Sequence, residues 1–141
     1  MKKVLIIGGA GFIGLSLTKR LSDKYEVHII DNFQRGKKDL EFKRIIKKKN
    51  VKLIKFDVSK KLRINHQYNY IFHLAAIVGV KNVISKPYDV LKKNIIFLKN
   101  AIDFSLKQKK LKRFFFFSTS EIYSGSIKSK LIKFPTPEEQ I

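Results

Sequence analysis

Apolar residues gather along the chain in short runs, and stretches of helical periodicity separate most of these runs. Five runs have the length and composition of buried strands, at residues 3–7 (KVLII), 27–30 (VHII), 51–56 (VKLIKF), 70–74 (YIFHL) and 114–118 (FFFFS). Helical spacing of apolar positions covers residues 12–21, about 39–48 and about 88–106, and only a short connection fits between the third and fourth runs. This alternation predicts an α/β fold, a Rossmann-like doubly wound parallel sheet with helices on both faces.

The fifth run consists of four consecutive phenylalanines, Phe114 to Phe117. Side chains of a strand alternate between the two faces of its sheet, so this run needs cover on both sides and suits an interior strand. No strand-like run follows Ser118 to lie beside it, and natural proteins avoid exposed apolar edge strands. We therefore expect residues 1–141 to be a single domain, truncated after about five strands, from the N-terminal half of a longer protein.

The first strand runs directly into a glycine-rich turn. Gly8, Gly11 and Gly14 lie between this strand and the first helix, where the turn, a pyrophosphate and helix packing each require a small residue. Asp31 ends the next strand, where a carboxylate can hydrogen-bond the ribose of a bound dinucleotide. A carboxylate there repels the 2′-phosphate of NADP, so the pattern predicts NAD. Arg35 could pair with such a phosphate, which keeps NADP as an alternative.

The composition adds a strong positive charge and excludes several kinds of site. Lys+Arg number 31 against 11 Asp+Glu, a formal net charge of +20, which raises nucleic acid as a partner. The basic runs at 47–49 and 107–113 fall where helices should end, opposite the ligand edge, so we expect a solvated surface and keep a nucleic-acid-binding variant as a lesser alternative. The chain has no cysteine, which fits a cytoplasmic location and excludes disulfides. Its three scattered histidines predict no metal site, and no segment is apolar for long enough to span a membrane.

Six short motifs occur in order over essentially the whole chain: GGAGFIG (8–14), Asp31-Asn32, Asp57-Val58, HLAA (73–76), Asn94 and STSEIYS (118–124). Together they resemble the extended short-chain dehydrogenase/reductase family, NAD-dependent epimerases and dehydratases that act on nucleotide sugars. The STSE form is most similar to GDP-mannose 4,6-dehydratases and UDP-glucuronate decarboxylases. The resemblance thus implies a nucleotide-sugar substrate and, in the full-length protein, a homodimer.

The resemblance also implies which residues bind NAD. They are Gly8, Gly11, Phe12, Ile13, Gly14, Asp31, Asn32, Asp57, Val58, Leu74, Ala75, Ala76 and Asn94. Asp57 and Val58 would approach the adenine, Leu74 to Ala76 the middle of the cofactor, and Asn94 the nicotinamide half. Structural interpretations remain open for HLAA, as a closely packed strand end, and for Asn94, as a polar residue inside a helix. We expect His73 to be a hydrogen-bonded histidine near the core.

The catalytic residues implied by the resemblance are Thr119, Ser120 and Glu121. Thr119 would hydrogen-bond the sugar hydroxyl that is oxidised, while Ser120 and Glu121 stand where dehydratases and decarboxylases carry polar or acidic residues. In such enzymes a base removes the C4 hydroxyl proton, NAD takes the C4 hydride, and the resulting 4-keto sugar reacts further before the cofactor is reoxidised. The base is the tyrosine of a Tyr-x-x-x-Lys motif.

That motif is where the chain departs from the family. The Tyr-x-x-x-Lys at Tyr88 and Lys92 precedes the fifth strand, whereas the family places its motif after it, so we interpret Tyr88 as a surface or packing residue. Tyr123 is followed four residues later by Ile127. We therefore expect the motif beyond Ile141 and no activity from residues 1–141 alone. A non-catalytic dinucleotide-binding or regulatory module of the same fold remains the alternative.

Overall fold

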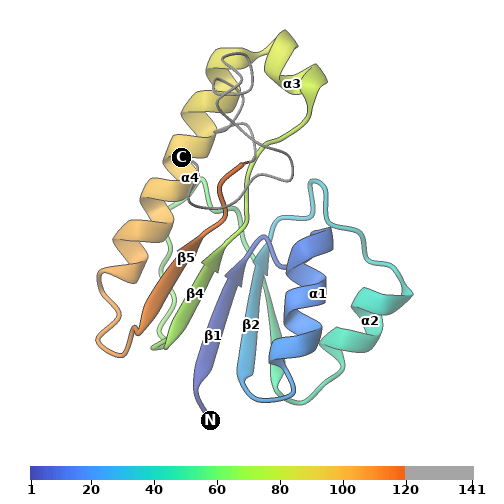
Figure 1. Ribbon diagram of the computed structural model, residues 1–141, viewed down its shortest axis with the longest axis vertical. Coiled ribbons are helices and arrows are strands. Elements are labelled where there is room, and N and C mark those ends of the chain that lie inside the picture. The colour runs from blue at the N-terminus through green and yellow to red at the C-terminus, as the bar shows by residue number, and fades with distance from the viewer. Residues whose placement is uncertain (120–141) are drawn as a thin grey trace, which may run out of the picture.

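The computed structural model describes residues 1–119 as a parallel sheet flanked by helices (Figure 1). The elements are β1 (Lys3–Ile7), α1 (Phe12–Leu21), β2 (Glu26–Asp31), α2 (Leu40–Ile46), β3 (Val51–Lys55), β4 (Tyr70–His73), α3 (Val80–Ser85), α4 (Pro87–Ser105) and β5 (Arg113–Phe116). The five strands pair in the order β3-β2-β1-β4-β5, and every pairing is parallel. The predicted Rossmann-like α/β fold is therefore confirmed.

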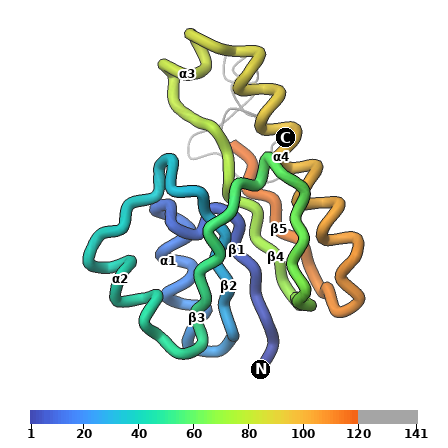
Figure 2. Tube along the Cα trace, turned by 180° about the vertical axis from the view of Figure 1, so that it is seen from behind, coloured from blue at the N-terminus to red at the C-terminus, as the bar shows by residue number. Residues whose placement is uncertain are grey.

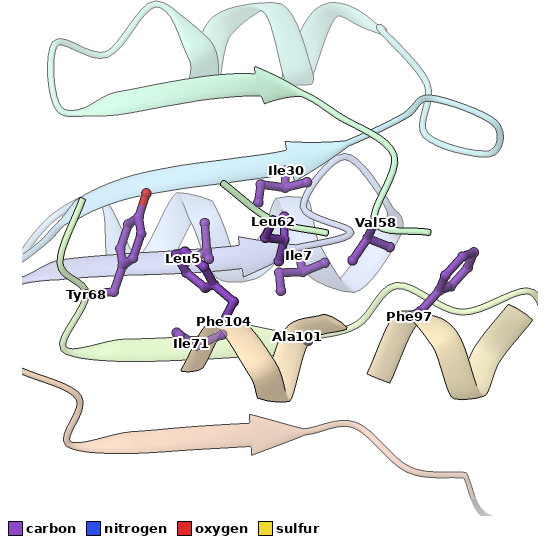
Figure 3. Close-up of a cluster of buried hydrophobic side chains, with 10 residues drawn as sticks. All are labelled: Leu5, Ile7, Ile30, Val58, Leu62, Tyr68, Ile71, Phe97, Ala101 and Phe104. Carbon is purple, nitrogen blue, oxygen red and sulfur yellow. The ribbon is translucent and has the colours of Figure 1, made fainter. Parts of the chain in front are cut away.

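The sheet is covered on both faces, which explains why apolar residues predominate in its central strands on both sides. Val4 and Ile6 of β1 belong to a buried cluster with residues of α1 and α2, such as Leu15 and Phe42. Leu5 and Ile7 point the other way, into a cluster with α4. Figure 3 shows this second cluster between the sheet and the helix, with the following side chains drawn: Leu5, Ile7, Ile30, Val58, Leu62, Tyr68, Ile71, Phe97, Ala101 and Phe104.

Local signals explain where two of the helices begin. Asp39 precedes α2, and its Oδ1 accepts a hydrogen bond from the Phe42 N–H at 2.8 Å, which satisfies a free donor of the first turn. Pro87 opens α4, where its fixed φ and missing N–H are tolerated. The short helix α3 was not predicted. It follows Gly79 at φ 112° and has no side-chain cap, so it lacks the usual starting signal.

The connection from β3 to β4 crosses the face that carries α4. Figure 2 shows it descending beside α4 from the end of β3 to the start of β4, and residues 56–69 contain no helix or strand. Buried Leu62 and Tyr68 fix it to the core, and the Tyr68 N–H donates to Gln108 Oε1 at 2.9 Å. The predicted absence of a helix between these strands is confirmed.

β5 lies at the edge of the sheet, and among the described residues it pairs with β4 alone. Phe114 packs on the α4 side, whereas Phe115 stacks on Phe72 with ring centroids 4.4 Å apart on the other side. Phe116 and Phe117 remain 54% and 41% exposed. The prediction that successive phenylalanines point to opposite faces of the sheet is confirmed. Among the described residues, this edge strand also exposes apolar side chains, as predicted.

Candidate functional site

The turn after β1 can be built only with glycine at two of its positions. Gly8 has φ 88°, and a Cβ there would lie 2.8 Å from the backbone nitrogen of Ala75, which follows β4. A Cβ on Gly14 would meet the Gly8 carbonyl oxygen and lie 2.7 Å from Gly9 Cα. The turn is therefore tight, and α1 packs against it, as the glycine spacing predicts.

The N-terminus of α1 opens toward solvent beside this turn. Gly11 is the N-cap, no side chain caps the first turn, and no acidic residue lies in it. Phe12 and Ile13, the first two residues of the helix, are exposed. A helix N-terminus carries partial positive charge and N–H donors without intrahelical partners, which together suit an anion such as a pyrophosphate.

Asp31 is fixed beside the turn by two backbone donors. Its Oδ2 accepts from the Ala10 N–H at 3.0 Å, and its Oδ1 accepts from the Phe33 N–H at 2.7 Å. Asn32 similarly closes its own loop, because its Oδ1 accepts from the Gln34 N–H at 3.0 Å. Each carboxylate oxygen retains a lone pair for a further donor. The acid predicted to meet a ribose is thus held rigidly at the C-terminal end of β2.

These groups line a cleft of about 1070 Å³ along the C-terminal ends of the strands. The predicted residues that line it are Gly8, Gly11, Phe12, Ile13, Gly14, Asp31, Asn32, Val58, Leu74, Ala75 and Ala76. The structure brings these residues to one place, although they come from four separate segments. In an open α/β sheet this edge is the usual position of a ligand.

Two predicted cofactor residues are not part of the cleft lining. The Asp57 carboxylate accepts from the Ser59 N–H at 2.9 Å and so stabilises its own turn. The Asn94 amide is bonded to the backbone of Ile77, with the Ile77 N–H donating to Oδ1 at 2.7 Å. Both residues support loops at the edge of the cleft, and the roles implied by the resemblance stay predictions.

The cleft also contains residues that sequence reasoning missed. Apolar lining comes from Ala10, Phe56, Ile77, Val78 and Phe97, and cationic lining from Lys37, Lys86 and Lys93. Most of them flank a predicted motif, so a signal existed in their position beside a strand end. Phe97 carried no such signal, because nothing in the sequence shows which turn of a long helix reaches the ligand edge.

The polar residues after β5 are only partly described. Ser118 lines the cleft, and Thr119, the next residue, is exposed. Ser120 and Glu121, predicted to be catalytic, lie outside the described residues, as do Tyr123 and Ile127. Tyr88 is exposed, with Lys92 Nζ 5.8 Å from its ring centroid, which confirms it as a surface residue.

His73 differs from its prediction. Its side chain is 3% exposed and stacks between Phe114 and Phe116, so it is near the core as expected. Its Nδ1, however, has no hydrogen-bond partner within the part of the chain that the structure describes, so the expectation of a satisfied histidine is wrong for this atom. Burial lowers the pKa of His73 from 6.5 to about 4 because the charged imidazolium is poorly solvated there.

A second buried polar cluster lies away from the cleft. His28 is fully buried, with Nδ1 2.7 Å from the Tyr68 hydroxyl and Nε2 2.9 Å from Glu26 Oε1. Glu26 also pairs with Lys3 at 3.4 Å and Lys52 at 3.1 Å. The hydrogen bond from His28 and the two lysines lower the pKa of Glu26 to about 2, while burial lowers the pKa of His28 and raises that of Tyr68. This cluster joins β1, β2, β3 and the 56–69 connection.

Other kinds of site receive no support from residues 1–119. Within this range no three His, Cys, Asp or Glu side chains are grouped to hold a metal ion, and no helix is both long and apolar enough to cross a bilayer. The basic runs at 47–49 and 107–113 lie in the connections that follow α2 and α4 and lead to the starts of β3 and β5. They are therefore at the edge opposite the cleft, as predicted.

Comparison with known proteins gives consistent matches. The model of the NAD dependent epimerase/dehydratase family matches residues 4–139. UDP-N-acetyl-alpha-D-glucosaminuronate decarboxylase of Bacillus cytotoxicus is 36% identical over 126 residues, covering 86% of this chain and 38% of that protein. UDP-glucuronic acid decarboxylase 1 of Danio rerio is 37% identical over 123 residues, covering 86% of this chain and 28% of that protein. The chain therefore spans well under half the length of these relatives.

A solved structure matches the fold. The Bordetella bronchiseptica enzyme WbmF in complex with NAD+ superposes with a TM-score of 0.71 and 25% sequence identity, covering 85% of this chain and 37% of that one. The described sheet thus corresponds to part of a larger protein of the same fold.

Proposed function

The chain belongs to the NAD dependent epimerase/dehydratase family, and from this premise we propose that it is the NAD-binding domain of an enzyme that acts on a nucleotide sugar. The observation that carries the proposal is the cleft in which the glycine turn, the open N-terminus of α1 and Asp31 meet. NAD, predicted from these residues, is also the cofactor that the family's description names. Similarity to two decarboxylases of UDP-linked uronic acids supports the same reaction class here.

The residues of the cleft fit NAD. A Cβ at Gly8 or Gly14 would fill the space that the turn requires, and the exposed first turn of α1 offers N–H donors to the pyrophosphate. Asp31 would accept hydrogen bonds from the adenosine ribose, and Val58 would contact the adenine with its apolar side chain. Leu74 to Ala76 would lie along the middle of the cofactor.

For the reaction we propose the sequence of steps that the family resemblance implies. NAD supplies a hydride acceptor for C4 of the sugar and returns the hydride later. Thr119 would hydrogen-bond the C4 hydroxyl and so orient it for loss of its proton. Glu121, with Ser120, would act in the following step, in which the carboxylate on the carbon beside the new ketone leaves as carbon dioxide and a proton takes its place on that carbon. The base that the resemblance implies is the tyrosine of a Tyr-x-x-x-Lys motif.

Calorimetric titration of the chain with NAD and NADP tests the cofactor proposal. We expect NAD to bind more tightly, and Asp31→Asn to narrow the difference because it removes the charge but keeps an acceptor for a backbone N–H. Asp23→Asn is the matched control, since Asp23 makes only an exposed ion pair with Lys48 at 3.2 Å. Equal affinities for NAD and NADP in the unaltered chain would contradict the role given to Asp31.

The reaction is tested separately, with the protein and any residues that its gene encodes beyond Ile141. UDP-glucuronate and UDP-N-acetylglucosaminuronate are supplied with NAD, and carbon dioxide and the nucleotide-sugar products are measured. Release of carbon dioxide with formation of a UDP-pentose-type product supports decarboxylation, whereas a 4-epimer would favour epimerase activity. NAD binding without turnover of either sugar would favour the non-catalytic module.

We also propose that a second copy of the chain is a partner. The outward face of α4 carries exposed Tyr88, Leu91, Ile95 and Ile102, opposite the buried face that holds Phe97. Such a stripe at three- and four-residue spacing is typical of helix–helix interfaces. Light scattering should show a dimer that Ile95→Lys dissociates, whereas a monomeric unaltered protein would exclude this partner. The predicted cytoplasmic location stays a prediction.

A further inference from the structure

Two asparagines of α4 bind the backbone of two different loops. Asn94 Oδ1 accepts from the Ile77 N–H at 2.7 Å, and its Nδ2 donates to the Ile77 carbonyl at 3.0 Å. Asn100 Nδ2 donates to the Val58 carbonyl at 2.9 Å and to the Ser59 carbonyl at 3.0 Å. Both hydrogens of the Asn100 amide are therefore used on one short segment of backbone.

The two loops each form part of the wall of the cofactor cleft. Val58 lies after β3 and Ile77 after β4, and both line the cleft. Neither segment belongs to a helix or strand, so the sheet ladder does not satisfy its backbone groups. At both places the side-chain amides of α4 hydrogen-bond these backbone groups instead of a neighbouring strand.

α4 is a rigid base for these contacts. Between the two asparagines lies Phe97, which is buried against the sheet and lines the cleft, and Ala101 next to Asn100 has no exposed surface. Side chains on a packed helix position a site more accurately than side chains on a loop. The two backbone segments are thus held relative to each other by Asn94 and Asn100 on one helix.

We infer that Asn100 and Asn94 are positioning residues of the cofactor site, which act through the backbone of Val58–Ser59 and of Ile77 and preorganise the two walls for the dinucleotide. The inference rests on the proposed function, since it takes NAD as the ligand of the cleft. Asn100 holds the adenine-side wall, and Asn94 holds the wall that faces the middle of the cofactor. Neither side chain needs to contact NAD for this role.

The test compares affinity with stability in the chain itself. Calorimetry measures the affinity for NAD and for AMP, which represents the adenine half, at a temperature where each variant is folded by circular dichroism. The variants are Asn94→Ala, Asn100→Ala and Asn100→Ser, the last of which keeps a small side-chain donor. The control is Asn50→Ala, because Asn50 Nδ2 also donates to two carbonyls, of Ser22 and Tyr25, at the opposite edge of the sheet.

We expect Asn100→Ala to weaken binding of NAD and AMP about threefold to tenfold, because a loosened Val58–Ser59 segment should cost the ligand about as much as one net hydrogen bond. Asn100→Ser should recover part of the loss. Asn94→Ala should weaken NAD and leave AMP unchanged, and Asn50→Ala should lower thermal stability with no change in either affinity. If all variants bind NAD like the unaltered chain while folded, the asparagines are structural only and the inference is overturned. Failure of the unaltered chain to bind NAD would overturn the proposed function itself, and the inference with it.

Discussion

Acidification should destabilise the protein through His73. Its pKa is lowered from 6.5 to about 4 by burial, so between these two values the unfolded chain binds more protons than the folded one. Stability is therefore complete above the unfolded pKa and is lost as the pH falls toward the folded pKa. By about pH 5 this residue alone should remove roughly 2 kcal/mol from the free energy of unfolding. That is a large part of the roughly 5–15 kcal/mol typical of a domain.

Urea unfolding followed by circular dichroism from about pH 8 to about pH 5 measures this loss. His73→Phe is the informative variant, because it keeps an aromatic ring between Phe114 and Phe116 but cannot titrate. Its free energy of unfolding should depend less on pH, with a residual slope from His28, whose pKa burial also lowers. Added salt in a parallel series separates this effect from general repulsion among the 31 Lys+Arg. An unchanged pH slope in His73→Phe, or a His73 imidazole that titrates near 6.5 by NMR, would refute the reasoning.

Three further outcomes are expected. Gly14→Ala should lower the free energy of unfolding by about 1–3 kcal/mol, because its Cβ would overlap with the turn. In Gly11→Ala the Cβ would meet its nearest neighbour at 3.4 Å, so this variant should keep the thermal midpoint and weaken NAD binding. A larger loss of stability in Gly11→Ala than in Gly14→Ala would count against the packing described. The Glu26 carboxylate should stabilise the fold above its unfolded pKa, and this stability should be lost as the pH falls from about 4.5 to about 2. Glu26→Gln should therefore lower the free energy of unfolding above about pH 4.5. Urea unfolding curves identical to those of the unaltered chain at that pH would exclude this contribution. Phe104→Ala should cost about 3–5 kcal/mol in urea unfolding, and the exposed control Leu106→Ala less than about 0.5 kcal/mol.

The sequence predicts the centre of the sheet well because β1 and β2 are long apolar runs buried on both faces. β1 and α1 lie at the predicted residues, since a continuous apolar run, a glycine turn and an amphipathic segment follow one another without ambiguity. α3 was missed because six residues after a glycine at positive φ give no periodic pattern. The 56–69 connection was identified because it shows no helical periodicity. Its path beside α4, however, depends on contacts with Gln108 and Asn100 that no local pattern encodes.

The parts of the site that could be predicted are those whose residue type has a specific structural or chemical role, such as the glycines of the turn and Asp31. The glycines and Asp31 lie at strand ends, and strand ends of a parallel sheet converge, so their meeting follows from the fold. The hydrogen bonds of Asn94 and Asn100 were not predictable, because an asparagine inside a helix has many possible partners and only the tertiary structure selects one. The same holds for the Nδ1 of His73, which has no hydrogen-bond partner among residues 1–119, since its surroundings come from β4 and β5 together.

The β3–β4 connection has a consequence for how the chain folds. Its hydrogen-bond partners on Asn100 and Gln108 lie 42 and 40 positions away along the chain. During synthesis β1, β2 and β3 emerge well before these partners, so the apolar side chains of Leu5 and Ile7 on this face stay uncovered until α4 is complete. Long-range contacts of this kind slow folding and prolong the exposure of apolar surface. We therefore expect the α4 face to be the last part of the described sheet to assemble, and the surface through which nascent chains aggregate.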